Sequence, residues 1–385
     1  MDVVAAGRVG LSEERLARIG PVMQAYVDEG KLPGVITLVA RQGQVARFEC
    51  FGMMDVEASK SMRADAILRI YSMTKPIASV AAMMLYEEAH FQLDDPVSRF
   101  IPAFKDVQVL EESGGETRLV APEREITIHD LMCHTAGLAF REGMWAKDNT
   151  LEEGVREQLA LPLVRQPGSL WEYSHATNVL GYVIELISGE PLDRFLKERI
   201  FDPLGMADTG FYVPPDQVGR LAAVYSRSES GELERADSED PDDFTRPPRM
   251  CQATGGLVST AADYLRFCRM MLNRGELDGV RLLGRKTVET MTVNHLPDRL
   301  LPIGFPDWTW HGYGFGLGVS VVTNAAQSQV LQSDGAYGWA GWASTHFWID
   351  PREALIGMIL TQLMPIYTYP IEAQFKTLVY QALVD

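Results

Sequence analysis

The sequence is poor in cysteine and in basic residues, and each shortage excludes a class of protein. Only four of its 385 residues are cysteines, and no two of them form a Cys-x-x-Cys pair. We therefore expect free thiols in a reducing compartment rather than a disulfide framework. Lys and Arg number 35 against 52 Asp and Glu, which gives a net charge of −17. This acidity argues against nucleic-acid partners and against docking on anionic membranes.

Long apolar runs are missing as well. No stretch approaches the roughly 18 consecutive apolar residues that suggest a membrane span. Residues 1–10 lack the basic and apolar regions of a signal peptide. We therefore expect a cytoplasmic protein that does not insert into a membrane. Apolar residues make up 46% of the chain and charged residues 23%, which is typical of a globular protein with a substantial core.

The common cofactor and nucleophile motifs are absent. No Gly-x-Gly-x-x-Gly or Walker-type loop occurs, so no nucleotide cofactor is expected. His129 and His134 are five residues apart, which does not align them on one helix face, and no other cluster is more favourable for a metal. No serine stands in Gly-x-Ser-x-Gly, which excludes the nucleophile elbow of α/β-hydrolases. The sequence thus predicts neither a cofactor nor a metal.

One short motif is a candidate for catalysis: Ser72 and Lys75, at the start of a predicted buried helix over residues 77–85. Pro76 is tolerated only in the first turn of a helix, so this helix begins near Ser72. Residues three apart share a helix face. A hydroxyl beside an amine at the positive end of a helix dipole can become an activated nucleophile. The alternative is a solvated Ser and Lys in an ordinary first turn.

Elsewhere the chain alternates between helix and strand patterns. We predict further helices at residues 11–30, 126–133, 151–161, 178–188, 192–200, 261–273 and 370–384. We predict strands at residues 35–40, 45–51, 315–322, 329–331, 343–349 and 354–363, and a surface loop at residues 226–249. This order predicts an α+β fold. In it, residues 1–92 and 226–385 form an antiparallel sheet flanked by terminal helices, residues 93–225 form an inserted, mostly helical domain, and the active site lies at their interface.

Two further stretches could complete the site. Tyr173 could supply a phenol, since a phenol near an ammonium has its pKa lowered and titrates together with it. The alternative is a core tyrosine beside the helix at 178–188. The Gly-rich stretch 335–343 could let a substrate approach the backbone and aim an N–H at a developing oxyanion. Its alternative is a tight turn lined with core tryptophans.

Taken together, these stretches resemble the serine β-lactamase-like hydrolases: class C β-lactamases, DD-peptidases and, most closely, family VIII carboxylesterases. The matching segments are Ser72-Met73-Thr74-Lys75 (Ser-x-x-Lys), the loop His134-Thr135-Ala136-Gly137-Leu138, Tyr173-Ser174-His175 (Tyr-x-Asn), Trp339-Ala340-Gly341 (Lys-Thr-Gly, or Trp-x-Gly in the esterases) and Asp350-Pro351. They follow the family's order over nearly the whole chain. The resemblance implies a β-lactamase/transpeptidase-like fold.

Two departures from the β-lactamase motifs bear on the substrate. His175 replaces an Asn, and it either contacts substrate or serves as a hydrogen-bonded structural histidine. Trp339 replaces the Lys that helps to hold a substrate carboxylate, so a neutral ester suits the pocket better. The resemblance places Trp339, Gly341 and His175 at the substrate. Nearby aromatic residues either line the cleft or belong to the core: Trp308, Trp310, Tyr313 and Trp342.

The resemblance implies a serine carboxylesterase that hydrolyses short-chain esters through an acyl-enzyme. Ser72 attacks the ester carbonyl, while Lys75 and Tyr173 share the proton as a coupled pair. The backbone N–H groups of Ser72 and Trp342 form the oxyanion hole. The expected binding partner of the protein is a small-molecule ester. Three alternatives stay open: hydrolysis of β-lactams or D-amino-acid peptides, acyl transfer to an alcohol or amine, and a non-catalytic scaffold, which the joint presence of the three side chains disfavours.

Overall fold

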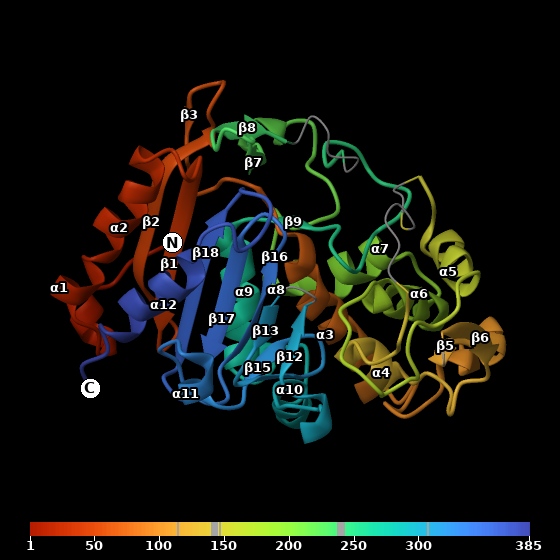
Figure 1. Ribbon diagram of the computed structural model, residues 1–385. Coiled ribbons are helices and arrows are strands. Elements are labelled where there is room, and N and C mark those ends of the chain that lie inside the picture. The colour runs from red at the N-terminus through yellow and green to blue at the C-terminus, as the bar shows by residue number, and fades with distance from the viewer. Residues whose placement is uncertain (114, 140–144, 146–147, 237–242, 306–307) are drawn as a thin grey trace.

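The fold is organised around one antiparallel sheet of eight strands, in the order β14-β15-β16-β17-β18-β1-β2-β3 (Figure 1). The computed structural model describes residues 1–385 except 114, 140–144, 146–147, 237–242 and 306–307. The strands of this sheet are β1 (Gly34–Arg41), β2 (Gln44–Asp55), β3 (Lys60–Ser61), β14 (Tyr313–Phe315), β15 (Ser320–Val322), β16 (Tyr337–Gly341), β17 (Thr345–Asp350) and β18 (Leu355–Thr361). The first and last thirds of the sequence therefore build one sheet.

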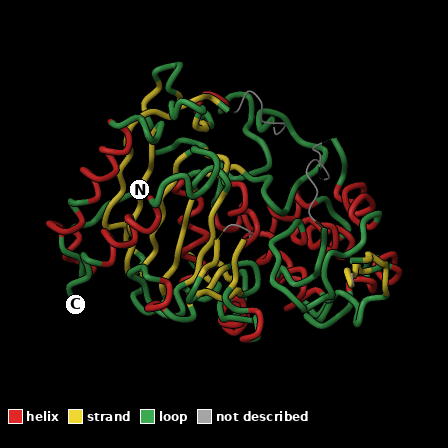
Figure 2. Tube along the Cα trace, viewed as in Figure 1, coloured by secondary structure: helices red, strands yellow, loops and turns green. Residues whose placement is uncertain are grey.

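Helices cover both faces of the sheet, which is why every residue of β1 is buried. Val35 and Val39 of β1 face one core with Phe375. Ile36 and Leu38 point the opposite way into a second core. The helices of the first face are α1 (Glu13–Leu16), α2 (Ile19–Asp28) and α12 (Ile371–Tyr380); α9 (Ala261–Leu272) and α3 (Thr74–Glu87) lie on the other. Figure 2 shows the sheet as the centre of the molecule with helices around it.

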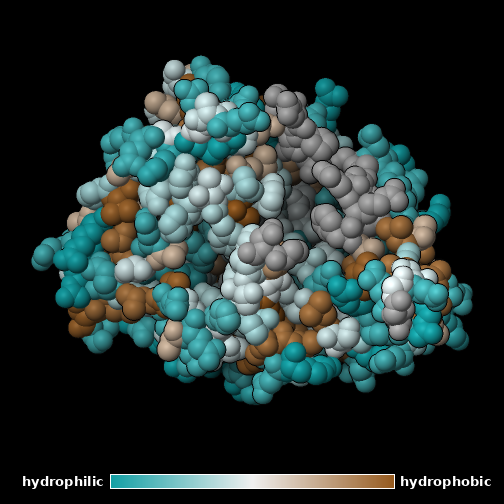
Figure 3. All heavy atoms as spheres, in the orientation of Figure 1, coloured by the Kyte–Doolittle hydropathy of each residue, from teal (hydrophilic) through white to brown (hydrophobic). Residues whose placement is uncertain are grey.

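Helix α3 is buried from Thr74 to Leu85 and follows a short 3-10 turn, η2 (Tyr71–Met73). It packs against α6 (Ala176–Ser188), so it lies between the sheet and the helical part of the molecule. A helix that is apolar all round needs such an enclosed position. In the described part of the chain, no helix combines the length and apolarity needed to cross a membrane. On the face in Figure 3, hydrophilic residues cover most of the surface.

The helical part lies to the right of the sheet in Figure 1. Its remaining helices are α4 (Ile128–Cys133), α5 (Leu151–Leu159) and α7 (Leu192–Leu196), the last continued by a π-helical turn, η5 (Lys197–Phe201), and by α8 (Asp202–Leu204). It also contains a hairpin of β5 (Val109–Ser113) and β6 (Glu116–Val120), which the sequence analysis missed. The division into a domain of residues 93–225 and a second one of 1–92 with 226–385 stays a prediction.

Two predicted elements are wrong because local breaks were overlooked. The predicted helix at 11–30 is split into α1 and α2, because Pro21 in the first turn of α2 has no N–H with which to continue the helix from α1. The predicted strand at 315–322 is a hairpin of β14 and β15. Gly318 turns the chain there with φ +89°, and a Cβ at this position would lie 2.1 Å from Ser79 Oγ.

Three further differences concern strands. Residues 329–331 are not a strand, because Gln329 takes a left-handed conformation after the short helix α11 (Ala325–Ser328). The predicted loop at 226–249 contains strand β8 (Leu233–Arg235) and overlaps β7 (Tyr225–Arg227), while its residues 237–242 lie outside the described residues. The stretch 335–343 contains β16, which its glycines concealed, since glycine is rare in strands.

Candidate active site

Ser72 lies in the turn that leads into α3. The residue before it, Tyr71, has φ 40°, which is strained for a bulky side chain and is typical of functional sites. The strained turn ends in the buried helix α3, which fixes the position of the serine. The sequence analysis anticipated the helix start, and the structure adds the 3-10 turn.

Lys75 and Tyr173 both lie within hydrogen-bond distance of Ser72. Lys75 Nζ is 3.0 Å from Ser72 Oγ, and the Tyr173 hydroxyl is 2.7 Å from the same oxygen. Lys75 Nζ also lies 4.5 Å from the centre of the Tyr173 ring. Tyr173 is 101 residues from Ser72 in the sequence and precedes α6, which packs against α3. The packing of these two helices therefore assembles the three side chains.

A backbone carbonyl fixes the other side of the lysine amine. Lys75 Nζ donates to the carbonyl of Thr254 at 2.9 Å. The N–H of Thr254 in turn donates to Asn178 Oδ1 at 2.8 Å. The sequence analysis missed both residues. A backbone carbonyl that accepts a hydrogen bond leaves no mark in the side-chain pattern. The only sequence signal for Thr254 was its place directly before Gly255 and Gly256.

Burial controls the protonation of the lysine. Lys75 is 1% exposed, and burial lowers the pKa of its amine well below the ordinary value. A neutral amine offers a lone pair to a neighbouring hydroxyl. Burial therefore favours the form of Lys75 that can accept a proton from the Ser72 hydroxyl.

Tyr173 behaves differently from the expectation. Burial raises the pKa of its phenol to about 12, and this effect outweighs the opposing hydrogen bond to Ser72. The expected lowering by a neighbouring ammonium is wrong, because burial also disfavours the positive charge on Lys75. Near neutral pH the phenol keeps its proton and acts as a donor.

Two histidines lie beside this cluster. Burial, and secondly the proximity of Lys75, lower the pKa of His175 to about 3, so His175 is neutral at physiological pH. His134 Nδ1 accepts the N–H of Ser174 at 3.3 Å, and its ring lies 4.8 Å from the Tyr173 ring. His134 therefore supports the segment that carries the phenol, whereas His175 lines the cavity described below.

Strand β16 forms the opposite wall of the site. Trp339 is 7% exposed and its ring lies 5.6 Å from that of Tyr173. Gly341 approaches the segment before Ser72 closely: a Cβ there would lie 2.3 Å from the carbonyl oxygen of Ile70. The absence of a side chain at Gly341 thus lets β16 pack against η2. The next residue, Trp342, is 51% exposed.

A cavity of about 1090 Å³ opens at the serine. It is lined by Ser72, Lys75, Tyr173, His175, Trp339, Gly341 and Trp342, and also by Trp308, Trp310 and Tyr313. All four aromatic residues whose position was left open therefore line the cavity. This apolar lining with few polar groups is typical of sites for small organic molecules.

The lining of the cavity also includes a charge pair, which was not expected from the sequence. Lys376 and Glu372 line the cavity, and Lys376 Nζ lies 2.8 Å from Glu372 Oε1. His346 Nδ1 lies 3.1 Å from the other carboxylate oxygen. Despite burial, Lys376 and His346 hold the pKa of Glu372 well below its ordinary value. The lining of the cavity therefore includes a lysine whose charge is paired with a carboxylate.

Asp350 lies away from this lining and has a structural role. Its carboxylate accepts the N–H of Arg352 at 3.0 Å and the hydroxyl of Tyr380 at 2.8 Å. These contacts tie the turn after β17 to α12. The predicted Asp-Pro segment is therefore part of the scaffold.

Known proteins match this chain over most of its length. A family model described as Beta-lactamase matches residues 21–377. Protein Rv1367c of Mycobacterium tuberculosis is 39% identical over 355 residues, which are 88% of this chain and 88% of that protein. Esterase EstB of Burkholderia gladioli is 34% identical over 211 residues, 51% of each protein. The solved structure of EstCE1, a hydrolase with promiscuous acyltransferase activity, has a TM-score of 0.81 at 28% identity and is matched over 95% of this chain and 99% of its own.

These matches confirm the α+β fold that the motifs predicted. The family model covers both the strands at the two ends of the chain and the helices between them. The protein belongs to the beta-lactamase family.

Proposed function

We propose that this protein is a serine carboxylesterase that hydrolyses neutral, small-molecule esters. The observation that carries the proposal is the contact of Ser72 Oγ with both the Lys75 amine, at 3.0 Å, and the Tyr173 hydroxyl, at 2.7 Å. The cluster faces a largely aromatic cavity. The similarity to an esterase, EstB, and to a hydrolase, EstCE1, supports the same reaction class.

The first step is acylation of the serine. Ser72 Oγ attacks the ester carbonyl and its proton passes to the neutral amine of Lys75. The carbonyl oxygen becomes an oxyanion, and the backbone N–H groups of Ser72 and Trp342 donate to it. Tyr173, which stays protonated because of its raised pKa, gives its proton to the departing alkoxide. The proton on Lys75 then returns to the phenolate.

The second step is hydrolysis of the acyl-enzyme. A water molecule takes the place of the alcohol and attacks the acyl carbonyl. Tyr173 takes the proton of this water as it passes its own proton to the neutral amine of Lys75, and the oxyanion forms again at the same two N–H groups. Cleavage of the acyl bond releases the acid, and Lys75 returns its proton to Ser72.

The walls of the cavity favour a neutral ester over a β-lactam. Trp339 stands where β-lactamases carry the lysine of Lys-Thr-Gly, so the site near Ser72 offers an aromatic face instead of a cation for a carboxylate. Among the described residues that line the cavity, the second lysine, Lys376, is paired with Glu372. The proposal therefore predicts fast turnover of p-nitrophenyl butyrate and slow turnover of nitrocefin.

Covalent labelling tests the proposal directly. A fluorophosphonate probe should label the wild-type protein and an exposed-serine control, Ser230→Ala, but not Ser72→Ala. Loss of p-nitrophenyl butyrate hydrolysis should follow the loss of label. An undiminished label on Ser72→Ala, or wild-type protein that takes no label, would overturn the assignment.

Acyl transfer to an alcohol is the second candidate. It is favoured by the similarity to EstCE1, a hydrolase with promiscuous acyltransferase activity, and by the half-exposed Trp342 at the cavity. Product analysis with an added alcohol acceptor distinguishes the two reactions. A new ester product that forms in water identifies transfer, whereas free acid alone identifies hydrolysis.

A further inference from the structure

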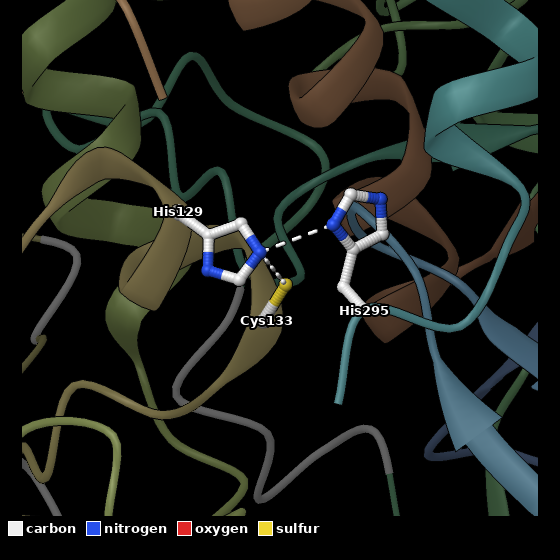
Figure 4. A group of neighbouring side chains, drawn as sticks. All are labelled: His129, Cys133 and His295. Atoms are coloured by element: carbon white, nitrogen blue, oxygen red, sulfur yellow. Dashed lines mark hydrogen bonds between the residues drawn. The ribbon is translucent and has the colours of Figure 1, made fainter. Parts of the chain in front are cut away.

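Three metal-ligating side chains gather at a place that does not line the cavity. His129 and Cys133 are four residues apart on α4, and His295 comes from the segment after α10 (Arg285–Met291). Their ligating atoms all lie within 4.8 Å of one another. Figure 4 shows the two imidazoles and the thiol pointing toward a common centre. The spacing of His129 and His134 does not predict a metal site, and none was expected elsewhere, whereas the fold brings His129 together with Cys133 and a distant histidine.

The distances resemble the edges of a tetrahedral site. Two nitrogens on one zinc ion lie about 3.3 Å apart, and a nitrogen and a sulfur about 3.6 Å apart, given the usual bond lengths. His129 Nε2 lies 3.1 Å from His295 Nδ1 and 3.6 Å from Cys133 Sγ. The remaining pair, Cys133 Sγ and His295 Nδ1, is within 4.8 Å. Shortening this distance to the ideal nitrogen–sulfur separation requires a movement of at most about 1.2 Å.

Contacts behind the ligands orient them for metal binding. His295 Nε2 lies 2.7 Å from the carbonyl oxygen of Thr290, so this nitrogen carries the proton and Nδ1 presents its lone pair. A backbone carbonyl behind a histidine is the usual support of a metal ligand. His129 and His295 are partly exposed, while Cys133 is buried, so an ion would approach from the side of the two imidazoles.

We propose that His129, Cys133 and His295 bind one zinc ion, with water as the fourth ligand. A thiolate with two imidazoles suits zinc and disfavours magnesium and calcium, which prefer oxygen. On binding, the Cys133 thiol releases its proton to solvent. The His129 ring changes tautomer: Nε2 gives up its proton and Nδ1 of the same ring takes one from solvent. The zinc–sulfur bond and two zinc–nitrogen bonds replace the hydrogen bond between the imidazoles and the one that the Cys133 thiol donates to the carbonyl of Gly316. This inference is independent of the proposed esterase activity.

The ion would join two segments that meet behind the candidate active site. Helix α4 is followed directly by His134, whose ring lies 4.8 Å from that of Tyr173 and 5.4 Å from that of Phe315. The backbone N–H of His295 donates to the carbonyl of Phe315 at 2.8 Å. Zinc would therefore tie α4 to the segment that packs on β14. Its expected effect is a more stable fold, because the ion binds the native state only.

The proposal is tested with the full, untagged chain, which is first treated with a chelator to remove bound metal and then titrated with zinc or cobalt. Titration calorimetry should find one zinc ion per chain, and cobalt should give the thiolate charge-transfer band. Cys133→Ser should abolish this band. His295→Gln should weaken zinc binding by about 100-fold or more. One equivalent of zinc should raise the wild-type Tm by about 2 °C or more and leave the variants unchanged.

Matched controls remove other cysteines and histidines. Cys50→Ser, at a half-buried thiol, and His90→Gln, at an exposed imidazole, should bind zinc like the wild type. Circular dichroism verifies the fold of each variant. If Cys133→Ser does not fold, the test rests on His295→Gln. Absence of stoichiometric binding to the wild type would overturn the proposal. So would zinc binding that His295→Gln retains at full strength.

Discussion

The hydroxyl of Tyr173 donates a hydrogen bond of 2.7 Å to Ser72 Oγ, across 101 residues of sequence. The two side chains reach each other because α6, which follows Tyr173, packs against α3, which follows Ser72. The donor is a phenol with a raised pKa. This relationship fixes the roles in the proposed mechanism: Lys75 accepts a proton and Tyr173 supplies one.

Tyr173→Phe removes the proposed proton donor and keeps the ring in place. We expect kcat to fall by about 10²–10⁴-fold, the usual effect of losing a general acid or base, with KM changed little. The fold should stay intact because the ring contacts with His134 and Trp339 remain. Steady-state kinetics with p-nitrophenyl butyrate provide the measurement, and Tyr26→Phe on α2 is the control. Equal kcat values for Tyr173→Phe and the control would contradict the proposed role.

The pH profile follows from the two shifted pKa values. Lys75 must be neutral to act, and its pKa is well below the ordinary value, so kcat/KM should rise with pH and reach its plateau below about 10, where a solvated lysine titrates. Activity should fall again only as Tyr173 ionises near its pKa of about 12. A profile measured in buffers of constant ionic strength checks this. An alkaline decline that begins near neutral pH would contradict the assignment of Tyr173 as the acid.

Gly341→Ala tests the close approach of β16 to the serine turn. The new Cβ would lie 2.3 Å from the carbonyl oxygen of Ile70, so β16 must move away and take the N–H of Trp342 with it. We expect a loss of about 10²–10³-fold in kcat, as for removal of one oxyanion donor. Gly7→Ala is the control, because a Cβ there meets nothing within 4 Å. A Gly341→Ala enzyme with full kcat would exclude Trp342 from the oxyanion hole.

Lys376→Met tests the charge pair of Lys376 and Glu372 in the lining of the cavity. Removing the lysine leaves Glu372 partly buried and without its closest cation, which should lower the free energy of unfolding by about 3 kcal/mol. The matched control is Arg156→Met. The side chains of Arg156 and its partner Glu152 are 72% and 58% exposed, so this ion pair should contribute at most about 0.5 kcal/mol to the free energy of unfolding. Urea unfolding gives both values. The double variant Glu372→Gln with Lys376→Met should be more stable than Lys376→Met alone.

The same pair predicts a loss of stability in acid. The pKa of Glu372 is lower in the folded protein than the value of about 4.3 in the unfolded chain. The stabilisation by this group is therefore fully present above that value and is lost as the pH falls toward the folded pKa. The difference in unfolding free energy between the wild type and Glu372→Gln, measured at several pH values, should shrink below about pH 4.

Sequence patterns located the serine turn well because Ser72, Lys75 and Pro76 are neighbours in the sequence, so their spacing alone predicts the helix start. Side-chain spacing and the rule for proline in a first turn are enough to place them on a helix start. The position of Tyr173 required the family resemblance, because no local pattern shows which distant residue reaches the serine. The pKa of its phenol could not be predicted, because it depends on how deeply the fold buries both partners.

The missed features share a physical cause: their effect arises from the backbone or from distant pairing. Thr254 acts through its carbonyl, and Gly341 acts through the absence of a side chain. Glu372 and Lys376 are four residues apart on a terminal helix, a spacing that is typical of an exposed face, and only the fold places them in the cavity. The strand β16 was concealed by its glycines, which pattern rules assign to turns.

Burial alone lowers the pKa of Lys75, without help from a neighbouring cation. In the proposed mechanism, the strength of the base therefore depends on the packing around an amine that is 1% exposed. A change that let water reach this amine would favour the ammonium and weaken the base.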